Sequence, residues 1–410
     1  MDDSKLNKIV SLTWKKKIVF SIVTLALSFF VIEILFRLIF SFYVGPSVLL
    51  YGTSFDRKLM APNYSELSSH PKTKPDASAY LYRMTEEEWL KRRNVEIPSN
   101  ELVGYSKYFA NQKRVDFDVE TGERFDVTIN SRGFRGRDFS EQKKPGVIRI
   151  LCLGSSSTFG YFDRDDETYP VYLEKILNER SGDKVKFEVL NLGIPHLSSG
   201  EIYNLFLAEG VPLEPDIVTF YEGNNDCEPP QQWLHKSLVH AGIKKVGRVF
   251  VLAKFIDSIS GKYLKFLYQD MSEQAVYDIR DNFIDNVSSI NNKCKNRGIQ
   301  FIIANQQKNS QSFDRDVLKT LTYQEEVEKI NSKLIKSGAL IHPELQLLIH
   351  SVLMKELEVW AKSNQIPFID IIDKLNHNRD VLVSWVHLSP TGNRMVAEAF
   401  SEKILQYVHR

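Results

Sequence analysis

The sequence predicts an α/β protein with a parallel, doubly wound sheet, preceded by one transmembrane helix. A long apolar run lies near the amino terminus, and further along the chain five short apolar segments alternate with helical patterns. With 410 residues, the chain is long enough for one large domain plus accessory segments. Lys and Arg total 53 against 52 Asp and Glu, so the charge balance favours no nucleic-acid partner.

The predicted transmembrane helix covers residues 18–44. This run is apolar apart from serine and threonine residues, Glu33 and Arg37, and it exceeds the roughly 20 residues that span a bilayer. Glu33 and Arg37 are four positions apart on one helix face, so we expect them to pair. A cleaved signal peptide has a shorter apolar core. We therefore expect a membrane protein with a single span.

Five lysines lie in residues 1–17, ahead of the apolar run. The positive-inside rule makes these residues a cytoplasmic tail, and everything after the span then faces the periplasm or the extracellular side. Residues 45–146 are expected to form a membrane-proximal region that packs on the main domain, with a strand over Glu123–Asn130 and a turn in NSRGFRG. Alternatively, the arginines of this region meet an anionic polymer or lipid.

The main domain is expected to cover residues 147–410, and it begins with a buried strand. Val147–Leu153 is mostly β-branched or aliphatic, and Gly154 lets the chain turn at its end. Ser156 then lies just beyond the carboxyl end of a parallel strand, where open α/β sheets bind their ligands. In the alternative interpretation, the serine cluster only caps the following helix.

Strands and helices alternate through the rest of this domain. Further strands are expected to end at Gly193, Gly223 and Asp370, and another to begin at Ile299. Helices are expected over Thr168–Glu179, Ser199–Glu209, Met271–Lys295 and Pro343–Ser363, and from Pro390 onward. Residues 227–270 do not continue this alternation and contain no strand pattern. We interpret them as a helical insertion over the strand ends or as plain packing helices. Five strands joined by helices predict right-handed crossovers.

Four positions at strand ends or in loops have the side chains or backbone groups that acyl transfer requires: Ser156, Gly193, Asn225 and His387. A serine hydroxyl becomes a nucleophile when a histidine accepts its proton. The backbone N–H groups of Ser156 and Gly193 and the amide of Asn225 would form an oxyanion hole. A lone loop histidine is usually only a surface residue, and the other three positions argue against that reading of His387.

The order of these segments resembles the SGNH, or GDSL-like, hydrolase superfamily. The family's Ser, Gly, Asn and His match Ser156 in LGSSSTFG, Gly193 in NLGIP, Asn225 in GNND and His387 in WVHLSPTGN. The turn NSRGFRG and the preceding anchor also resemble a bacterial membrane-anchored branch. The resemblance implies a flavodoxin-like sheet and a serine esterase, acylhydrolase or acyltransferase without metal or organic cofactor. It implies acylated small molecules, glycans or lipids of the cell envelope as substrates.

The sequence departs from the family pattern at two positions. Position 155 is Ser where the family name has Asp, and Ser384 stands where most members have an acid three residues before the histidine. That acid orients the imidazole and stabilises its charged form. Upstream carboxylates that could replace it are Asp370, Asp373 and Asp380. A non-catalytic glycan-binding or envelope-assembly protein is therefore the alternative from another functional class, beside an O-acyltransferase with the same site.

Overall fold

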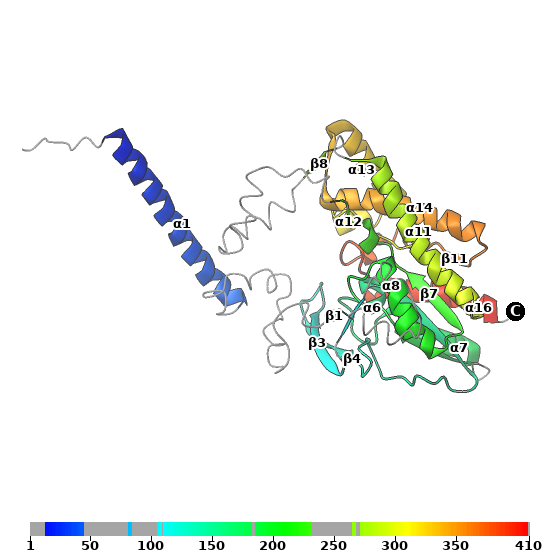
Figure 1. Ribbon diagram of the computed structural model, residues 1–410. Helices are drawn as coiled ribbons and strands as arrows, with labels where there is room; N and C mark the ends of the chain where they lie inside the picture. Colours follow the sequence, from blue (N-terminus) through cyan, green and yellow to red (C-terminus); the bar gives the residue numbers. More distant parts are fainter. Residues whose placement is uncertain are drawn as a thin grey trace, which may run out of the picture. The chain divides into compact units, whose positions relative to one another are not determined.

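The computed structural model describes residues 13–44, 81–83, 105–108, 110–182, 185–230, 265–267 and 271–408 (Figure 1). The chain divides into two compact units, one of residues 1–69 with 236–262 and one of residues 70–235 with 263–410. Most of the expected cytoplasmic tail lies outside the described residues, as do much of the membrane-proximal region and most of the helical insertion at 227–270.

The first unit contains helix α1, Trp14–Val44. An 18-residue window within its segment Trp14–Ile39 has a mean hydropathy of 2.6, and the segment is long and apolar enough, by length and composition, to cross a membrane. As expected from their spacing, Arg37 Nε donates a hydrogen bond to Glu33 Oε1 over 2.7 Å. This ion pair joins the two charged side chains of the apolar run that follows the three lysines at the start of α1.

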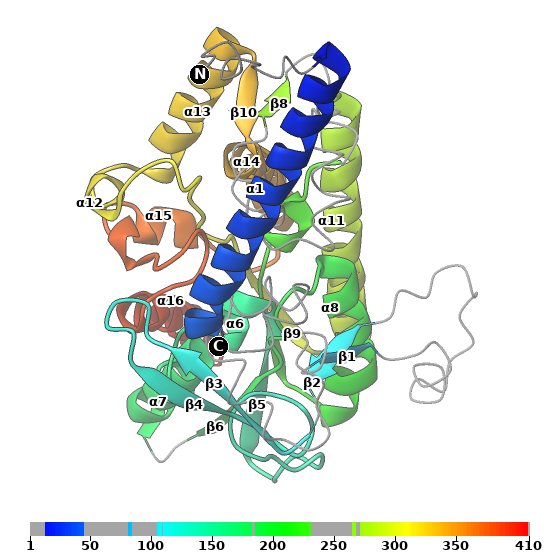
Figure 2. The same ribbon diagram turned by 90° about the vertical axis from the view of Figure 1, so that its left-hand side faces the viewer.

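A five-stranded parallel sheet organises the second unit, which confirms the predicted sheet (Figure 2). Its strands are β5 (Val147–Gly154), β6 (Lys186–Asn191), β7 (Ile217–Tyr221), β9 (Gln300–Ala304) and β11 (Phe368–Ile369). They lie in the order β11-β9-β7-β5-β6. Numbered along the chain, this is the doubly wound order 2-1-3-4-5, whose direction reverses between β5 and β7. The crevice for a ligand is therefore expected beyond the carboxyl ends of these two strands.

Helices cover both faces of this sheet. α7 (Tyr169–Ser181) packs with α16 (Pro390–Val408), and their apolar side chains form one core with Ile150 and Cys152 of β5. α8 (Ser199–Leu205), α11 (Glu273–Lys295) and α14 (His342–Ser363) form the other layer, in which α11 contacts both other helices. Residues 150 to 153 of β5 are fully buried, as expected of a central strand.

The expected strand at Glu123–Asn130 is β4 (Arg124–Ile129). It pairs antiparallel with β3 (Gln112–Phe117), which is one of several elements that were not predicted from the sequence. Between β9 and α14 lie α12 (Arg315–Leu318), α13 (Tyr323–Ser337) and β10 (Ala339–Ile341), which pairs with β8 (Lys265–Leu267). The remaining short elements are β1 (Leu81–Arg83), β2 (Ser106–Tyr108), α6 (Ser156–Phe159), α15 (Ile371–Leu375), the π-helical turn Phe206–Gly210, and the 3-10 turns Val211–Leu213, Asn225–Cys227 and Arg379–Val381.

Two glycines allow helix α6 to sit close to its neighbouring strands. A Cβ atom on Gly154 would lie 2.6 Å from the carbonyl oxygen of Tyr221. A Cβ on Gly193 would lie 2.4 Å from the backbone nitrogen of Phe159, which belongs to α6. Both distances are shorter than any ordinary van der Waals contact, so a larger residue would push α6 away from the sheet.

Gly193→Ala is predicted to destabilise the protein by about 1–3 kcal/mol, because its methyl group overlaps backbone atoms that cannot move independently. Urea unfolding of the full chain in detergent micelles measures the change. Gly200→Ala in α8 is the control, since its nearest new contact is a side-chain amide 3.3 Å away. Equal effects of the two substitutions would contradict the close packing of Gly193 on α6.

Candidate active site

The fold brings Ser156 and His387 into contact. Ser156 is the first residue of α6, immediately beyond β5, and His387 lies in the loop that precedes α16. Ser156 Oγ and His387 Nε2 are 2.8 Å apart, although 231 positions separate the two residues. Ser156 is half-buried and His387 is 6% exposed. A hydroxyl and an imidazole nitrogen at this distance have the geometry that a serine nucleophile and its general base require.

The other imidazole nitrogen contacts a hydroxyl group instead of a carboxylate. His387 Nδ1 lies 2.7 Å from Ser384 Oγ, and this oxygen also accepts the backbone N–H of His387 over 3.1 Å. A proton on Nδ1 that is donated to Ser384 leaves Nε2 free to accept the proton of Ser156. Within the described ranges, His387 has no hydrogen bond to any of the three upstream carboxylates, Asp370, Asp373 and Asp380.

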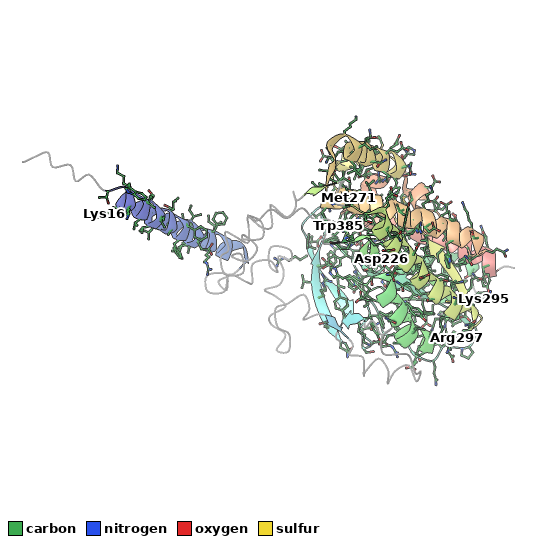
Figure 3. The ribbon with its side chains drawn as sticks, turned by 45° about the horizontal axis from the view of Figure 1, so that its top comes forward. Lys16, Asp226, Met271, Lys295, Arg297 and Trp385 are labelled. Carbon is green, nitrogen blue, oxygen red and sulfur yellow. The ribbon has the colours of Figure 1, made fainter. Side chains whose placement is uncertain are left out.

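Aromatic rings surround the imidazole of His387. The ring of Tyr161 stacks on it at a centroid distance of 5.4 Å, and the rings of Phe162 and Trp385 pack edge-on at 5.3 and 5.6 Å. Figure 3 draws the side chains of this unit and labels Trp385, which is 38% exposed. These rings hold the plane of the imidazole and exclude water from it.

Burial lowers the pKa of His387 to about 3, with further lowering by the positive charges of His196 and Lys308. The imidazole is therefore neutral at pH 7, which is the form a general base needs. Among the described residues, no carboxylate contributes to this pKa, so an imidazolium at position 387 would receive no compensation from a negative charge.

Two of the three expected oxyanion donors have internal hydrogen-bond partners. Gly193 N–H donates to Asn191 Oδ1 over 2.9 Å. Asn225 Nδ2 donates to Ser155 Oγ over 2.6 Å and to the carbonyl oxygen of Leu197 over 2.9 Å. A ligand oxygen that used these donors would have to replace the internal acceptors.

Two carboxyl groups, the buried Glu222 and the half-buried Asp226, fix the loop that carries Asn225. Glu222 Oε1 accepts the backbone N–H of Asn225 over 3.0 Å, and Asp226 Oδ1 accepts the hydroxyl of Ser199 over 2.6 Å. Burial raises the pKa of Glu222 to about 7 and that of Asp226 to about 6. Sequence reasoning did not assign roles to these two residues. Within the described ranges, no cluster of His, Cys, Asp and Glu is arranged to hold a metal ion.

The segment that follows β9 is a second support that sequence reasoning missed. Residues 305–310, NQQKNS, are all buried. Gln306 Oε1 accepts the backbone N–H of Asn224 over 2.9 Å, and Gln306 Nε2 donates to Ser157 Oγ over 3.1 Å. An unbroken polar run directly after an apolar strand was the available signal, because such side chains must find partners once they are buried.

No family model matches the chain, and no curated protein matches it. Among solved structures, a GDSL-like lipase from Bacteroides thetaiotaomicron is 14% identical, with 63% of this chain and 88% of that chain covered and a TM-score of 0.35.

Two acetyl xylan esterases are also similar at 14% identity and a TM-score of 0.37. One is the enzyme named AlAXEase, with 64% of this chain and 100% of that chain covered, and the other comes from Geobacillus stearothermophilus, with 63% and 94% covered. At these scores, the likeness adds no weight to the strand order and side-chain geometry of this chain.

We predict that His387 stays neutral down to pH 5 and that Ser384→Asp raises its pKa by about 1–3 pH units, because a carboxylate stabilises the imidazolium. Nitrogen NMR of the full chain labelled with [15N]histidine follows this titration. Ser384→Ala is the control and should leave the pKa low. Titration of wild-type His387 near pH 6.5 would contradict the electrostatic description.

Proposed function

We propose that the protein is a serine esterase or acylhydrolase with Ser156 as nucleophile and His387 as general base. The observation that carries this proposal is the 2.8 Å contact between Ser156 Oγ and His387 Nε2, together with the Ser384 hydroxyl on the opposite imidazole nitrogen. The resemblance of four ordered sequence motifs to SGNH hydrolases supports the same chemistry.

In the proposed reaction, Ser156 Oγ attacks the ester carbonyl carbon while His387 Nε2 takes the hydroxyl proton. The carbonyl oxygen becomes an oxyanion, which the Ser156 N–H, the Gly193 N–H and the Asn225 amide stabilise. The intermediate collapses, the C–O bond of the ester breaks, and the alcohol leaves with the proton from His387. Water then attacks the acyl-serine with His387 again as base, which releases the acid and restores Ser156.

The proposed cellular arrangement follows from helix α1. We infer that α1 spans the membrane with the lysine-rich tail in the cytoplasm and with the second unit on the periplasmic or extracellular side. An enzyme in that position would act on O-acyl groups of an extracytoplasmic glycan or lipid. An O-acyltransferase would use the same acyl-serine, with a sugar hydroxyl in place of water.

A second candidate function is a non-catalytic glycan-binding or envelope-assembly protein. Ser384 in place of an acid, and the low pKa of His387 that accompanies it, favour this alternative. In serine proteases, disabling the corresponding acid costs about 10⁴ in rate. Whether Ser156 is still activated decides between the two functions.

We predict that a fluorophosphonate probe labels the full chain in detergent at Ser156, because a base-activated serine attacks phosphorus as it attacks an ester carbonyl. Mass spectrometry locates the adduct. Ser156→Ala should abolish labelling. Ser157→Ala removes the adjacent buried hydroxyl, which contacts Gln306 and the carbonyl of Val386, and should retain it.

Labelling that persists in Ser156→Ala would refute the role of Ser156 as nucleophile. A folded wild-type chain that takes up no probe would favour the binding or assembly function.

A further inference from the structure

Lys308 is a buried lysine beside the proposed active site. Its side chain is fully buried, and in the described part of the chain its Nζ makes one hydrogen bond, to Asn224 Oδ1 over 2.6 Å. No ion pair joins it to a carboxylate among the described residues. A buried ammonium group with so little compensation is unfavourable for folding. Retaining it therefore calls for a use beyond packing.

Hydrogen bonds connect Lys308 to the proposed oxyanion hole. Asn224 accepts from Lys308 through Oδ1, and its Nδ2 donates to Asn225 Oδ1 over 3.1 Å. Asn225 Nδ2 in turn donates to Ser155 Oγ over 2.6 Å, next to Ser156. Each donor in such a chain withdraws electron density from the next amide, so its N–H becomes a stronger donor.

The amide relay has little freedom to rearrange. The backbone N–H of Asn224 is held by Gln306 Oε1 and that of Asn225 by Glu222 Oε1. The side-chain amides of both asparagines therefore keep their positions between Lys308 and Ser155. A relay held in this way can act without reorganisation when charge develops on the substrate.

We propose that Lys308 is a positioning residue that polarises the Asn225 amide through Asn224 and so strengthens the oxyanion hole. This inference rests on the proposed function. The charge of Lys308 disfavours the imidazolium of His387, but no hydrogen bond links the two residues, whereas the relay leads directly to the oxyanion. Stabilisation of the oxyanion thus offsets part of what is lost with Ser384 in place of an acid.

Lys308 is charged at neutral pH. Burial lowers its pKa to about 8, and neighbouring acidic groups oppose this lowering. The titratable groups that face it are Glu222, Cys227, Glu228, Glu326, His350 and His387. Burial raises the pKa of Glu222 to about 7, close to that of Lys308. Variants at position 308 are therefore needed to show that a loss of activity near pH 8 comes from Lys308.

The test compares Lys308→Met with the wild-type full chain in detergent, with p-nitrophenyl acetate as substrate. We expect kcat to fall about tenfold, less than the loss of a direct oxyanion donor, with KM little changed. Lys308→Arg keeps the charge and should remove the alkaline limb near pH 8. Lys319→Met is the matched control, because that lysine is exposed, and it should leave kcat unchanged.

A double-mutant cycle separates the relay from a merely structural role. Asn224→Ala breaks the same chain of hydrogen bonds. The kcat of the double variant with Lys308→Met should therefore equal that of the slower single variant. Additive losses would overturn the relay, and so would a fall in kcat for Lys319→Met as large as that for Lys308→Met.

A second readout does not depend on turnover. In the full chain labelled with [15N]asparagine, the side-chain resonance of Asn225 should shift near pH 8 in the wild type and in Lys319→Met, but not in Lys308→Met. Absence of that shift in the wild type would overturn the relay. A wild-type chain that shows the shift but hydrolyses no ester would refute the proposed function and leave the polarisation of Asn225 supported.

Discussion

The contact between Ser156 and His387 depends on the assembly of the whole sheet. Ser156 follows the first strand of the sheet, β5, and His387 precedes the last helix, α16, so every crossover between them must be in place before the two side chains meet. Gly154 and Gly193 make this possible because they let α6 lie against β7 and the end of β6. The contact lies beside the reversal of strand order between β5 and β7, which is where doubly wound sheets bind their ligands.

The electrostatics of the site differ from those of a serine, histidine and acid triad. Nδ1 of His387 contacts the Ser384 hydroxyl, and aromatic rings surround the imidazole. Burial lowers the pKa of His387 to about 3. Such a base accepts a proton less readily, so stabilisation in the proposed reaction must come from the oxyanion side. In the proposal, the N–H groups of Ser156 and Gly193, the Asn225 amide and the buried charge of Lys308 supply this stabilisation.

The sequence allowed prediction of the features that depend on local patterns. The parallel strands were predictable because each apolar run is bounded by turn residues, as at Gly154, and the strand-end positions of Ser156 and Asn225 followed from the same pattern. Strand β3 was missed because its residues, QKRVDF, are mostly polar and bury only two side chains. Helix α13 was missed although Thr322 and Glu325 form a capping box, a signal that the sequence carries.

The supports of the site are side-chain contacts that were not predicted from the sequence, and some of them join residues far apart in the chain. Ser384 was recognised as a departure, but only the fold shows that its hydroxyl meets His387 Nδ1. The pairing of Lys308 with Asn224 spans 84 positions and links two different strand ends. Glu222 and Gln306 hold the loop that carries Asn225 because their side-chain oxygens accept backbone N–H groups of that loop. Such contacts have no sequence signature.

The proposed reaction requires that Ser156 forms an acyl-enzyme with His387 as its base. Rapid acid quench of the full chain after mixing with p-nitrophenyl acetate, followed by peptide mass spectrometry, detects this intermediate. We expect the mass of one acetyl group on the peptide that contains Ser156, and its loss in His387→Ala. Acetylation that is absent from Ser156, or that is unchanged without the imidazole, would refute the proposed reaction.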